Sequence, residues 1–175
     1  MFPGRYIQGP DALRHLGKEV KRFGKQGFII ADPFVNDELL PGYLPEIKKE
    51  AGIATESLKG ECSDKEIQRL MKLVQDNKSD VVIGFGGGKT IDTAKAVAHE
   101  TKKPMIIIPS IASTDAPCSA LSVIYTEGGE VDRYLFLLKN PEVVIVDTQI
   151  VANSPTRFLI AGRGDALATW FEAES

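Results

Sequence analysis

Three consecutive glycines followed by a lysine are the residues of this chain whose type and spacing best fit phosphate binding. Gly86, Gly87, Gly88 and Lys89 follow the apolar run 81–85 and precede a segment with helical periodicity. A turn without side chains lets backbone N–H groups approach a phosphate, with the positive end of the helix dipole behind them. The pattern therefore predicts a phosphorylated ligand, with a dinucleotide as the first candidate. A strand-to-helix turn without a ligand is the alternative.

This turn matches neither of the two standard phosphate-binding fingerprints. Read from Gly84 and Gly86, the dinucleotide fingerprint G-x-G-x-x-G requires a third glycine where Lys89 stands. The P-loop requires a glycine six residues before its lysine, and that position is Ile83. The local residues indicate phosphate binding without identifying the class of protein.

Polar side chains gather where two other apolar segments end. The segment after the run 105–108 is rich in groups that can hydrogen-bond a sugar, a phosphate or a polyol. These are Ser110, Ser113, Thr114, Asp115 and Ser119. Equally, they can cap one another in a loop bounded by prolines. Asp32 ends a strand and suits a ribose, but in a Rossmann unit that acid comes about 20 residues after the glycines. A helix or turn cap is its equal alternative.

The remaining candidates for catalysis are isolated in the sequence. Asp165 begins a helical segment, and locally an N-cap is favoured over a ligand facing a cleft. His15 and His99 lack neighbours at metal-ligand spacing, as do the two cysteines, which we expect to be reduced thiols. No Ser-His-Asp or Cys-His pairing indicates a self-contained hydrolase.

Apolar strands alternate with amphipathic helices along most of the chain. We expect strands over 27–32, 53–58, 81–85, 105–108 and 143–147. We expect helices over 11–23, 45–51, 63–74, 90–99 and 165–175, and another opened by Ser154 as N-cap with Pro155. Ser63 and Glu66 have the spacing of a capping box. Segments 121–125 and 133–137 predict a β-hairpin.

This alternation predicts an α/β fold with a parallel sheet covered by helices on both faces. Ligands in such sheets bind beyond the carboxyl ends of the strands. Asp32, the glycine turn and the loop after Pro109 are therefore expected at one edge of the sheet.

Length and charge narrow the possible partners. The 175 residues suit one domain, or one domain with an appendage. The net charge is −3 and the basic residues are scattered, which argues against a nucleic-acid partner. No apolar run has the length of a membrane span. The start lacks a signal-peptide core, so we expect a cytoplasmic protein, with the mitochondrial matrix as the alternative if a presequence has been removed.

Longer stretches resemble the glycerol dehydrogenases of the iron-containing, or group III, alcohol dehydrogenase superfamily. These stretches are GFGGGKTIDTAKAVAH, IPSIASTDAPCSALSVIYT, VIVDT and GDALATWFEAES, with GRYIQGP near the start. The resemblance implies an enzyme that uses NAD and zinc to oxidise glycerol to dihydroxyacetone, or another small diol to the corresponding product. It also implies a homo-oligomer. It implies a Rossmann-like NAD-binding domain over 1–153 and the start of a truncated helical metal-binding domain over 154–175.

The resemblance also assigns roles to individual residues. Gly86, Gly87, Gly88 and Lys89 would hold the NAD pyrophosphate, and Asp32 would bind the adenosine ribose. The cofactor cleft would be lined by Ser110, Ser113, Ser119, Leu121 and Tyr125.

Two aspartates are the catalytic residues that the resemblance implies. Asp115 would contact the polyol substrate, and Asp165 would be a zinc ligand, which replaces the local cap interpretation. Relatives commonly carry threonine at the position of Ser110 and an aliphatic residue at that of Arg163.

The resemblance leaves the zinc site incomplete. A catalytic zinc takes three protein ligands, and the family's two zinc-binding histidines come from a C-terminal helical domain that is absent from these 175 residues. The chain alone is therefore expected to be inactive. One alternative is a dehydrogenase for another diol or for glycerol 1-phosphate, although no basic residue lies between Ile106 and Tyr125 to bind a phosphorylated substrate. The other is a non-catalytic nucleotide-binding module that self-associates through Trp170 and Phe171.

Overall fold

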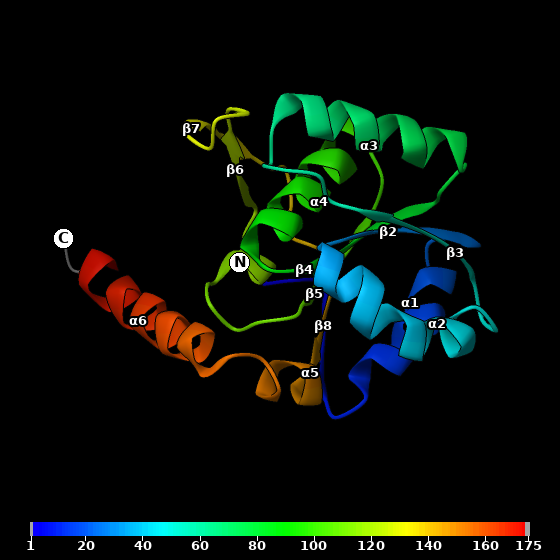
Figure 1. Cartoon of the computed structure of the whole chain (residues 1–175), viewed down its shortest axis with the longest axis horizontal. Coiled ribbons are helices and arrows are strands. Elements are labelled where there is room, and N and C mark those ends of the chain that lie inside the picture. Colours follow the sequence, from blue (N-terminus) through cyan, green and yellow to red (C-terminus); the bar gives the residue numbers. More distant parts are fainter. Residues whose placement is uncertain (1, 174–175) are drawn as a thin grey trace.

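A six-stranded parallel sheet forms the centre of the molecule (Figure 1), which is described by a computed structural model over residues 2–173. The spatial order of the strands is β1-β8-β5-β4-β2-β3, and every neighbouring pair is parallel. The strands are β1 (Arg5–Gly9), β2 (Gln26–Ala31), β3 (Gly52–Ser57), β4 (Val81–Gly86), β5 (Met105–Pro109) and β8 (Val143–Asp147). The predicted α/β fold is confirmed, and β1 is a strand that the sequence pattern did not predict.

Helices cover both faces of this sheet (Figure 1). On one side lie α1 (Leu16–Lys21), α2 (Leu40–Ile47) and the short α5 (Thr148–Ala152). On the other lie α3 (Asp64–Asp76) and α4 (Gly88–Thr101). Successive residues of a strand point to opposite faces, so Ile83 of β4 joins the first core cluster and Val82 joins the second. Because both faces are buried, the central strands are apolar throughout.

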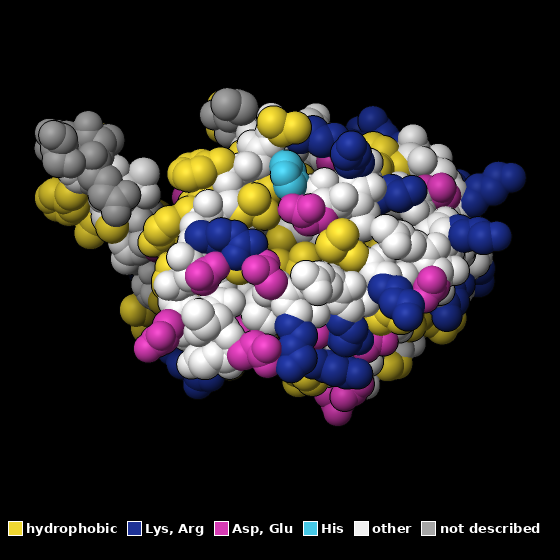
Figure 2. All heavy atoms as spheres, turned by 90° about the horizontal axis from the view of Figure 1, so that it is seen from above, with side chains coloured by type: hydrophobic (Ala, Val, Ile, Leu, Met, Phe, Trp, Pro, Cys, Tyr) yellow, Lys and Arg dark blue, Asp and Glu magenta, His cyan; other side chains and the backbone are white. Residues whose placement is uncertain are grey.

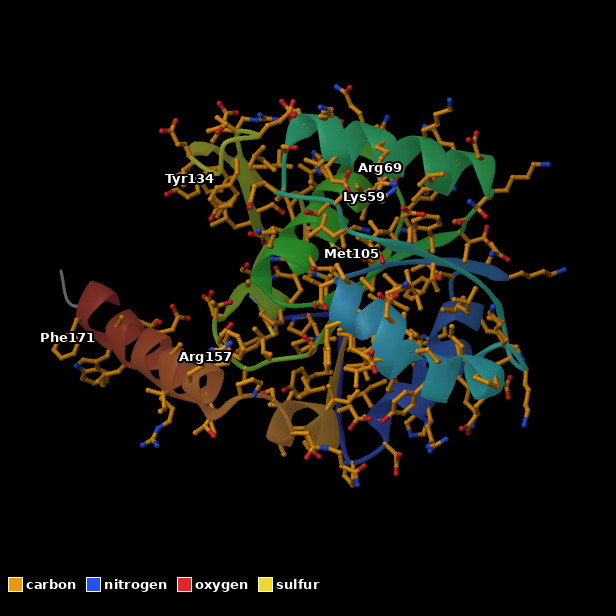
Figure 3. The ribbon with its side chains drawn as sticks, viewed as in Figure 1. Lys59, Arg69, Met105, Tyr134, Arg157 and Phe171 are labelled. Carbon is orange, nitrogen blue, oxygen red and sulfur yellow. The ribbon has the colours of Figure 1, made fainter. Side chains whose placement is uncertain are left out.

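The predicted hairpin is present beside the main sheet. Strands β6 (Leu121–Tyr125) and β7 (Val131–Phe136) pair antiparallel, and β6 packs against α4. Figure 3 shows Tyr134 on this hairpin and Phe171 near the far end of α6 (Thr156–Ala173). The hairpin thereby covers part of α4 and carries the chain back toward β8.

Helix α6 projects from the body as an arm (Figures 1 and 2). Leu159, Ile160, Leu167, Trp170 and Phe171 on it are all more than half exposed. No helix within residues 2–173 has the length and apolarity needed to cross a membrane. On the face in Figure 2, basic and acidic side chains are interspersed rather than gathered into a basic stripe.

The helix predicted over 45–51 is displaced in the structure. Helix α2 spans Leu40–Ile47 and follows a wide helical turn at Val35–Leu39. Proline is tolerated in the first turn of a helix, where its missing N–H has no partner to lose. Pro41 takes that place, while Pro45 lies inside the helix.

The predicted capping box does not form. Ser63 precedes α3 in an extended conformation, but its side chain caps no N–H group. The Glu66 carboxylate instead accepts hydrogen bonds from the Lys59 backbone N–H at 2.8 Å and from Arg69 at 2.7 and 2.8 Å. A charged guanidinium competes successfully for the carboxylate because such bonds are stronger than neutral ones.

Two predicted starts of helices near the end of the chain are also wrong. Ser154 is not the N-cap, because α6 begins at Thr156 and the Ser154 hydroxyl donates to the Val151 carbonyl at the end of α5. Asp165 lies inside α6, so it cannot be an N-cap either. Residues 174–175 of the expected last helix lie outside the described part of the chain.

Candidate functional site

The glycine turn joins the end of β4 to the start of α4. Gly86 ends the strand, Gly87 is the N-cap, and Gly88 begins the helix. A Cβ atom added at Gly86 would lie 2.7 Å from Oδ2 of Asp32 and 2.8 Å from Thr90, whereas one added at Gly88 would meet no atom within 4 Å. Gly86 is therefore required by packing, while Gly88 keeps an open approach to the unpaired N–H groups at the helix N-terminus.

A large cavity of about 760 Å³ lies on one side of this turn. Five of the predicted site residues line it: Asp32, Gly87, Gly88, Lys89 and Ser110. Most of the remaining wall is apolar, including Phe34, Tyr43, Ile111 and Phe158. A largely apolar wall with a few convergent polar groups is typical of a site for a small molecule or cofactor.

A second cavity of about 420 Å³ begins at the same turn. Six predicted site residues line it: Gly88, Lys89, Asp115, Ser119, Leu121 and Tyr125. Because Gly88 and Lys89 line both cavities, the start of α4 lies between them. The tertiary structure thus brings the glycine turn, the loop after β5 and the first hairpin strand to two cavities that share Gly88 and Lys89.

Three of the predicted residues line neither cavity. Gly86 packs against Asp32, and Ser113 lies in the loop that α6 approaches at Gly162. Asp165 lies next to this loop, where its Oδ2 accepts a hydrogen bond from the Asp115 N–H at 3.0 Å. The substrate and metal residues implied by the resemblance are therefore neighbours, although 50 positions separate them.

Asp32 caps a helical turn and also lies in the wall of the large cavity. Its Oδ1 accepts from the Val35 N–H at 2.9 Å, so it caps the helical turn after β2. The same side chain lines the large cavity. Burial raises the pKa of the Asp32 carboxyl, while the backbone N–H groups of Val35, Gly87 and Phe34 act to lower it.

Lys89 is held by an acidic partner that the sequence pattern did not single out. Its Nζ lies 2.7 Å from Oε1 of Glu61, in an ion pair whose lysine side chain is 47% exposed. Glu61 itself lines the second cavity. An incoming phosphate would therefore compete with Glu61 for the Lys89 ammonium group.

The hydroxyl-rich loop after β5 uses part of its polar groups on itself. Thr114 Oγ1 accepts from the Ala116 N–H at 3.2 Å, and the Ser119 hydroxyl donates to the Ala116 carbonyl at 3.3 Å. The mutual capping that the sequence allows for this loop is thus present. It is compatible with ligand binding, because Ser110 and Ser119 also line the two cavities.

Two charged residues at the second cavity were not predicted from the sequence: Asp92 lines the cavity, and Lys95 lies behind this wall. The Lys95 side chain is fully buried in α4, and its Nζ lies 3.7 Å from Oδ1 of Asp92. Burial lowers the pKa of Lys95 and raises that of Asp92, and each charge opposes the shift in the other. The sequence carries one signal of this pair, an Asp-x-x-Lys spacing inside the apolar segment 91–98.

Among the described residues, no three histidine, cysteine, aspartate or glutamate side chains lie close enough together to hold a metal ion. Asp165 therefore stands as a single carboxylate beside the loop that carries Asp115. One carboxylate does not make the three-ligand set of a catalytic zinc.

The parallel sheet and the paired cavities beyond its carboxyl edge have the arrangement of ligand-binding α/β proteins. Residues 3–148 match the family described as iron-containing alcohol dehydrogenase. The chain belongs to that family, which confirms the resemblance seen in its sequence.

Several glycerol dehydrogenases are similar to the chain along nearly its whole length. The chain is 58% identical to glycerol dehydrogenase from Thermotoga maritima over 175 residues, which are 100% of this chain and 48% of that protein. It is 51% identical to the Pseudomonas putida protein over 99% of this chain and 48% of that protein. The crystal structure of glycerol dehydrogenase from Schizosaccharomyces pombe matches with a TM-score of 0.89 at 39% identity, over 100% of this chain and 45% of that one. The chain spans about half the length of the curated relatives it matches.

Proposed function

We propose that this chain is the cofactor-binding portion of an NAD-dependent dehydrogenase that oxidises glycerol to dihydroxyacetone. The observation that carries the proposal is the meeting of two cavities at Gly88 and Lys89. A dinucleotide has two halves joined by a pyrophosphate, and this site has two compartments joined by a glycine turn at a helix N-terminus. The similarity to glycerol dehydrogenases supports a polyol substrate.

The positions of the side chains support one orientation of NAD. The pyrophosphate would lie over Gly87, Gly88 and Lys89, and the adenosine ribose would lie in the large cavity with Asp32. The nicotinamide would then enter the second cavity, whose wall includes Asp115. This orientation brings the end that accepts hydride to the residue proposed to contact the polyol.

The protein's part in this reaction is to bind and orient its reactants. NAD accepts the hydride, and zinc, when bound, would polarise the substrate hydroxyl and lower its pKa. Asp115 would hold the polyol, and Asp165 would supply one metal ligand. We infer that residues 1–153 bind the nucleotide. Because one carboxylate is not a catalytic zinc site, we also infer that residues 1–175 alone do not catalyse the reaction.

Calorimetry with NADH on the purified 175-residue chain tests the cofactor role. We expect measurable binding that weakens when Lys89 is replaced by methionine, and no glycerol-dependent NADH formation. A folded sample without nucleotide binding would contradict the proposal.

In a longer protein that carries these residues, comparing glycerol, other vicinal diols and glycerol 1-phosphate as substrates separates the proposed activity from its relatives. Cytoplasmic localisation and a homo-oligomeric state belong to the same proposal.

A second candidate function is a nucleotide-binding module that self-associates without catalysis. The observation in its favour is the apolar surface of α6, where Trp170 and Phe171 are each 65% exposed. Apolar surface of this kind commonly marks an interaction site. Light scattering tests it: a concentration-dependent mass that Trp170→Ser abolishes supports self-association, and a monomer at every concentration contradicts it.

A further inference from the structure

One turn of α4 is tied to the wall of the second cavity by buried polar contacts. The Lys95 ammonium group donates to Oγ of Ser119 at 3.0 Å and to the carbonyl of Leu121 at 2.8 Å. Its side chain is 0% exposed, and the Asp92 carboxylate is its nearby countercharge at 3.7 Å. The three donors of a lysine ammonium group thus face three oxygen atoms.

Asp92 extends the same connection along the hairpin strand. Its Oδ2 accepts from the Val123 N–H at 3.2 Å, and its backbone carbonyl accepts from the Ser122 hydroxyl at 3.1 Å. Two hydrogen bonds from Lys95 and two to Asp92 therefore fasten one helical turn to the segment 119–123.

This segment forms much of the second cavity's wall. Ser119, Leu121 and Val123 line that cavity, and so does Asp92 itself. The N-terminus of the same helix carries Gly88 and Lys89, which border both cavities. A single helix therefore sets the distance between the glycine turn and the wall of the second cavity.

We propose that Lys95 is a positioning residue that shapes the second cavity for the nicotinamide half of the cofactor and leaves the adenosine half unaffected. The inference rests on the proposed function, because that function places the nicotinamide in this cavity. An apolar residue at position 95 would leave the Leu121 carbonyl and Ser119 hydroxyl without their donor and Asp92 without its countercharge. The segment 119–123 would then shift, while the large cavity, which none of these residues lines, would keep its shape.

Comparing the binding of ADP and NADH tests whether Lys95 affects only the nicotinamide half, because ADP would occupy only the large cavity and the glycine turn. In Lys95→Met we expect NADH to bind about tenfold or more weakly, because the buried partners of the ammonium group lose their charged donor. We expect ADP affinity to stay within about twofold. Lys72→Met, which changes an exposed lysine on α3, should alter neither affinity.

Two further measurements keep the inference testable if Lys95→Met does not fold. Lys95→Gln retains an N–H donor for the Leu121 carbonyl and should show a smaller loss, again confined to NADH. In the unchanged protein, NADH but not ADP should slow amide hydrogen exchange over residues 119–123. Equal losses for ADP and NADH, no loss for either, or equal protection by both ligands would overturn the role of Lys95. Failure of the unchanged protein to bind either nucleotide would instead overturn the proposed function.

Discussion

The main-chain N–H of Asp115 donates a hydrogen bond to Oδ2 of Asp165 at 3.0 Å, which ties the loop after β5 to the middle of α6. The helix approaches this loop most tightly at Gly162, where an added Cβ would lie 2.2 Å from the Ala112 carbonyl oxygen. Gly164 on the same helix would meet no atom within 4 Å. The proposed substrate and metal residues are therefore adjacent because one glycine permits the helix to dock.

Gly162→Ala is expected to push α6 away from the loop and to break the bond between Asp115 and Asp165. Forcing a methyl group into a packed contact typically costs about 1–3 kcal/mol. Amide hydrogen exchange at Asp115 should become faster by about tenfold or more as that bond is lost. Hydrogen exchange followed by mass spectrometry measures the change.

Gly164→Ala is the matched control for that experiment. It lies in the same helix in open space, so alanine should stabilise the helix by up to about 1 kcal/mol through its higher propensity. The two alanines are thus expected to act in opposite directions. Similar exchange rates at Asp115 in both variants would show that Gly162 does not control the docking of α6.

Gly88→Ala should separate cofactor binding from stability. Its new Cβ would meet no protein atom within 4 Å, yet it would lie at the start of α4 between the two cavities, where the proposed NAD pyrophosphate would bind. We expect the unfolding temperature to stay the same or rise, while NADH affinity falls about tenfold or more, because the added methyl group would keep a phosphate away from the N–H groups at the helix N-terminus. Calorimetry and thermal unfolding measure the two quantities.

Gly86→Ala provides the contrast within the same turn. Its Cβ would lie 2.7 Å from Oδ2 of Asp32 and 2.8 Å from Thr90, so this variant should lose about 1–3 kcal/mol of stability. If Gly88→Ala lowered the unfolding temperature as much as Gly86→Ala, the open approach at Gly88 would be refuted.

Asp32 predicts a pH dependence of cofactor binding. Burial raises the folded-state pKa of Asp32 above its usual value. The neutral carboxyl therefore contributes to the stability of the fold at pH values below the unfolded-state pKa of about 3.9. This contribution is lost as the pH rises through the folded-state pKa. Asp32→Asn should therefore be at least as stable as the unchanged protein at neutral pH. It should bind NADH about tenfold more weakly there, because a charged acceptor for the ribose hydroxyls is gone.

The pH profile supplies the control for that variant. NADH affinity of the unchanged protein should fall as pH is lowered through the raised pKa of Asp32, whereas the Asp32→Asn profile should lack this step. Parallel profiles for the two proteins would assign the pH dependence to another group.

The ion pair between Lys89 and Glu61 predicts a competition at the mouth of the site. Glu61→Gln should free Lys89 for phosphate and tighten NADH binding by up to about fivefold, since exposed ion pairs contribute about 0–1 kcal/mol. The gain should shrink at high salt as the charges are screened. Lys89→Met should weaken binding instead, and titrations at two salt concentrations measure both effects. If Glu61→Gln weakened binding as much as Lys89→Met, Glu61 would be orienting Lys89 rather than competing for it.

The sequence alone predicted the helices and strands correctly where the apolar pattern of a segment matched its burial in the fold. The strand 81–85, the glycine turn and the helix after it are present because continuous apolar residues need both sheet faces covered and glycines leave room for close packing. Asp32 and the loop after Pro109 reach the carboxyl edge of the sheet because all their strands run in parallel. Most of the candidate cofactor residues followed from these rules together with the family resemblance.

Tertiary contacts established what the sequence pattern left open. Glu66 accepts from Arg69 rather than completing a capping box, because the stronger charged donor is brought within reach in the folded chain. In the sequence, Lys95 has the pattern of an ordinary helical lysine. Its burial follows from the packing of α4 against the hairpin in the folded chain. The alternating elements and the glycine turn were predictable from the residues alone, since they depend on local periodicity and steric freedom. The pairing of Asp115 with Asp165 and of Lys95 with Ser119 was not, since it depends on contacts between segments distant in the chain that exist only once the chain has folded.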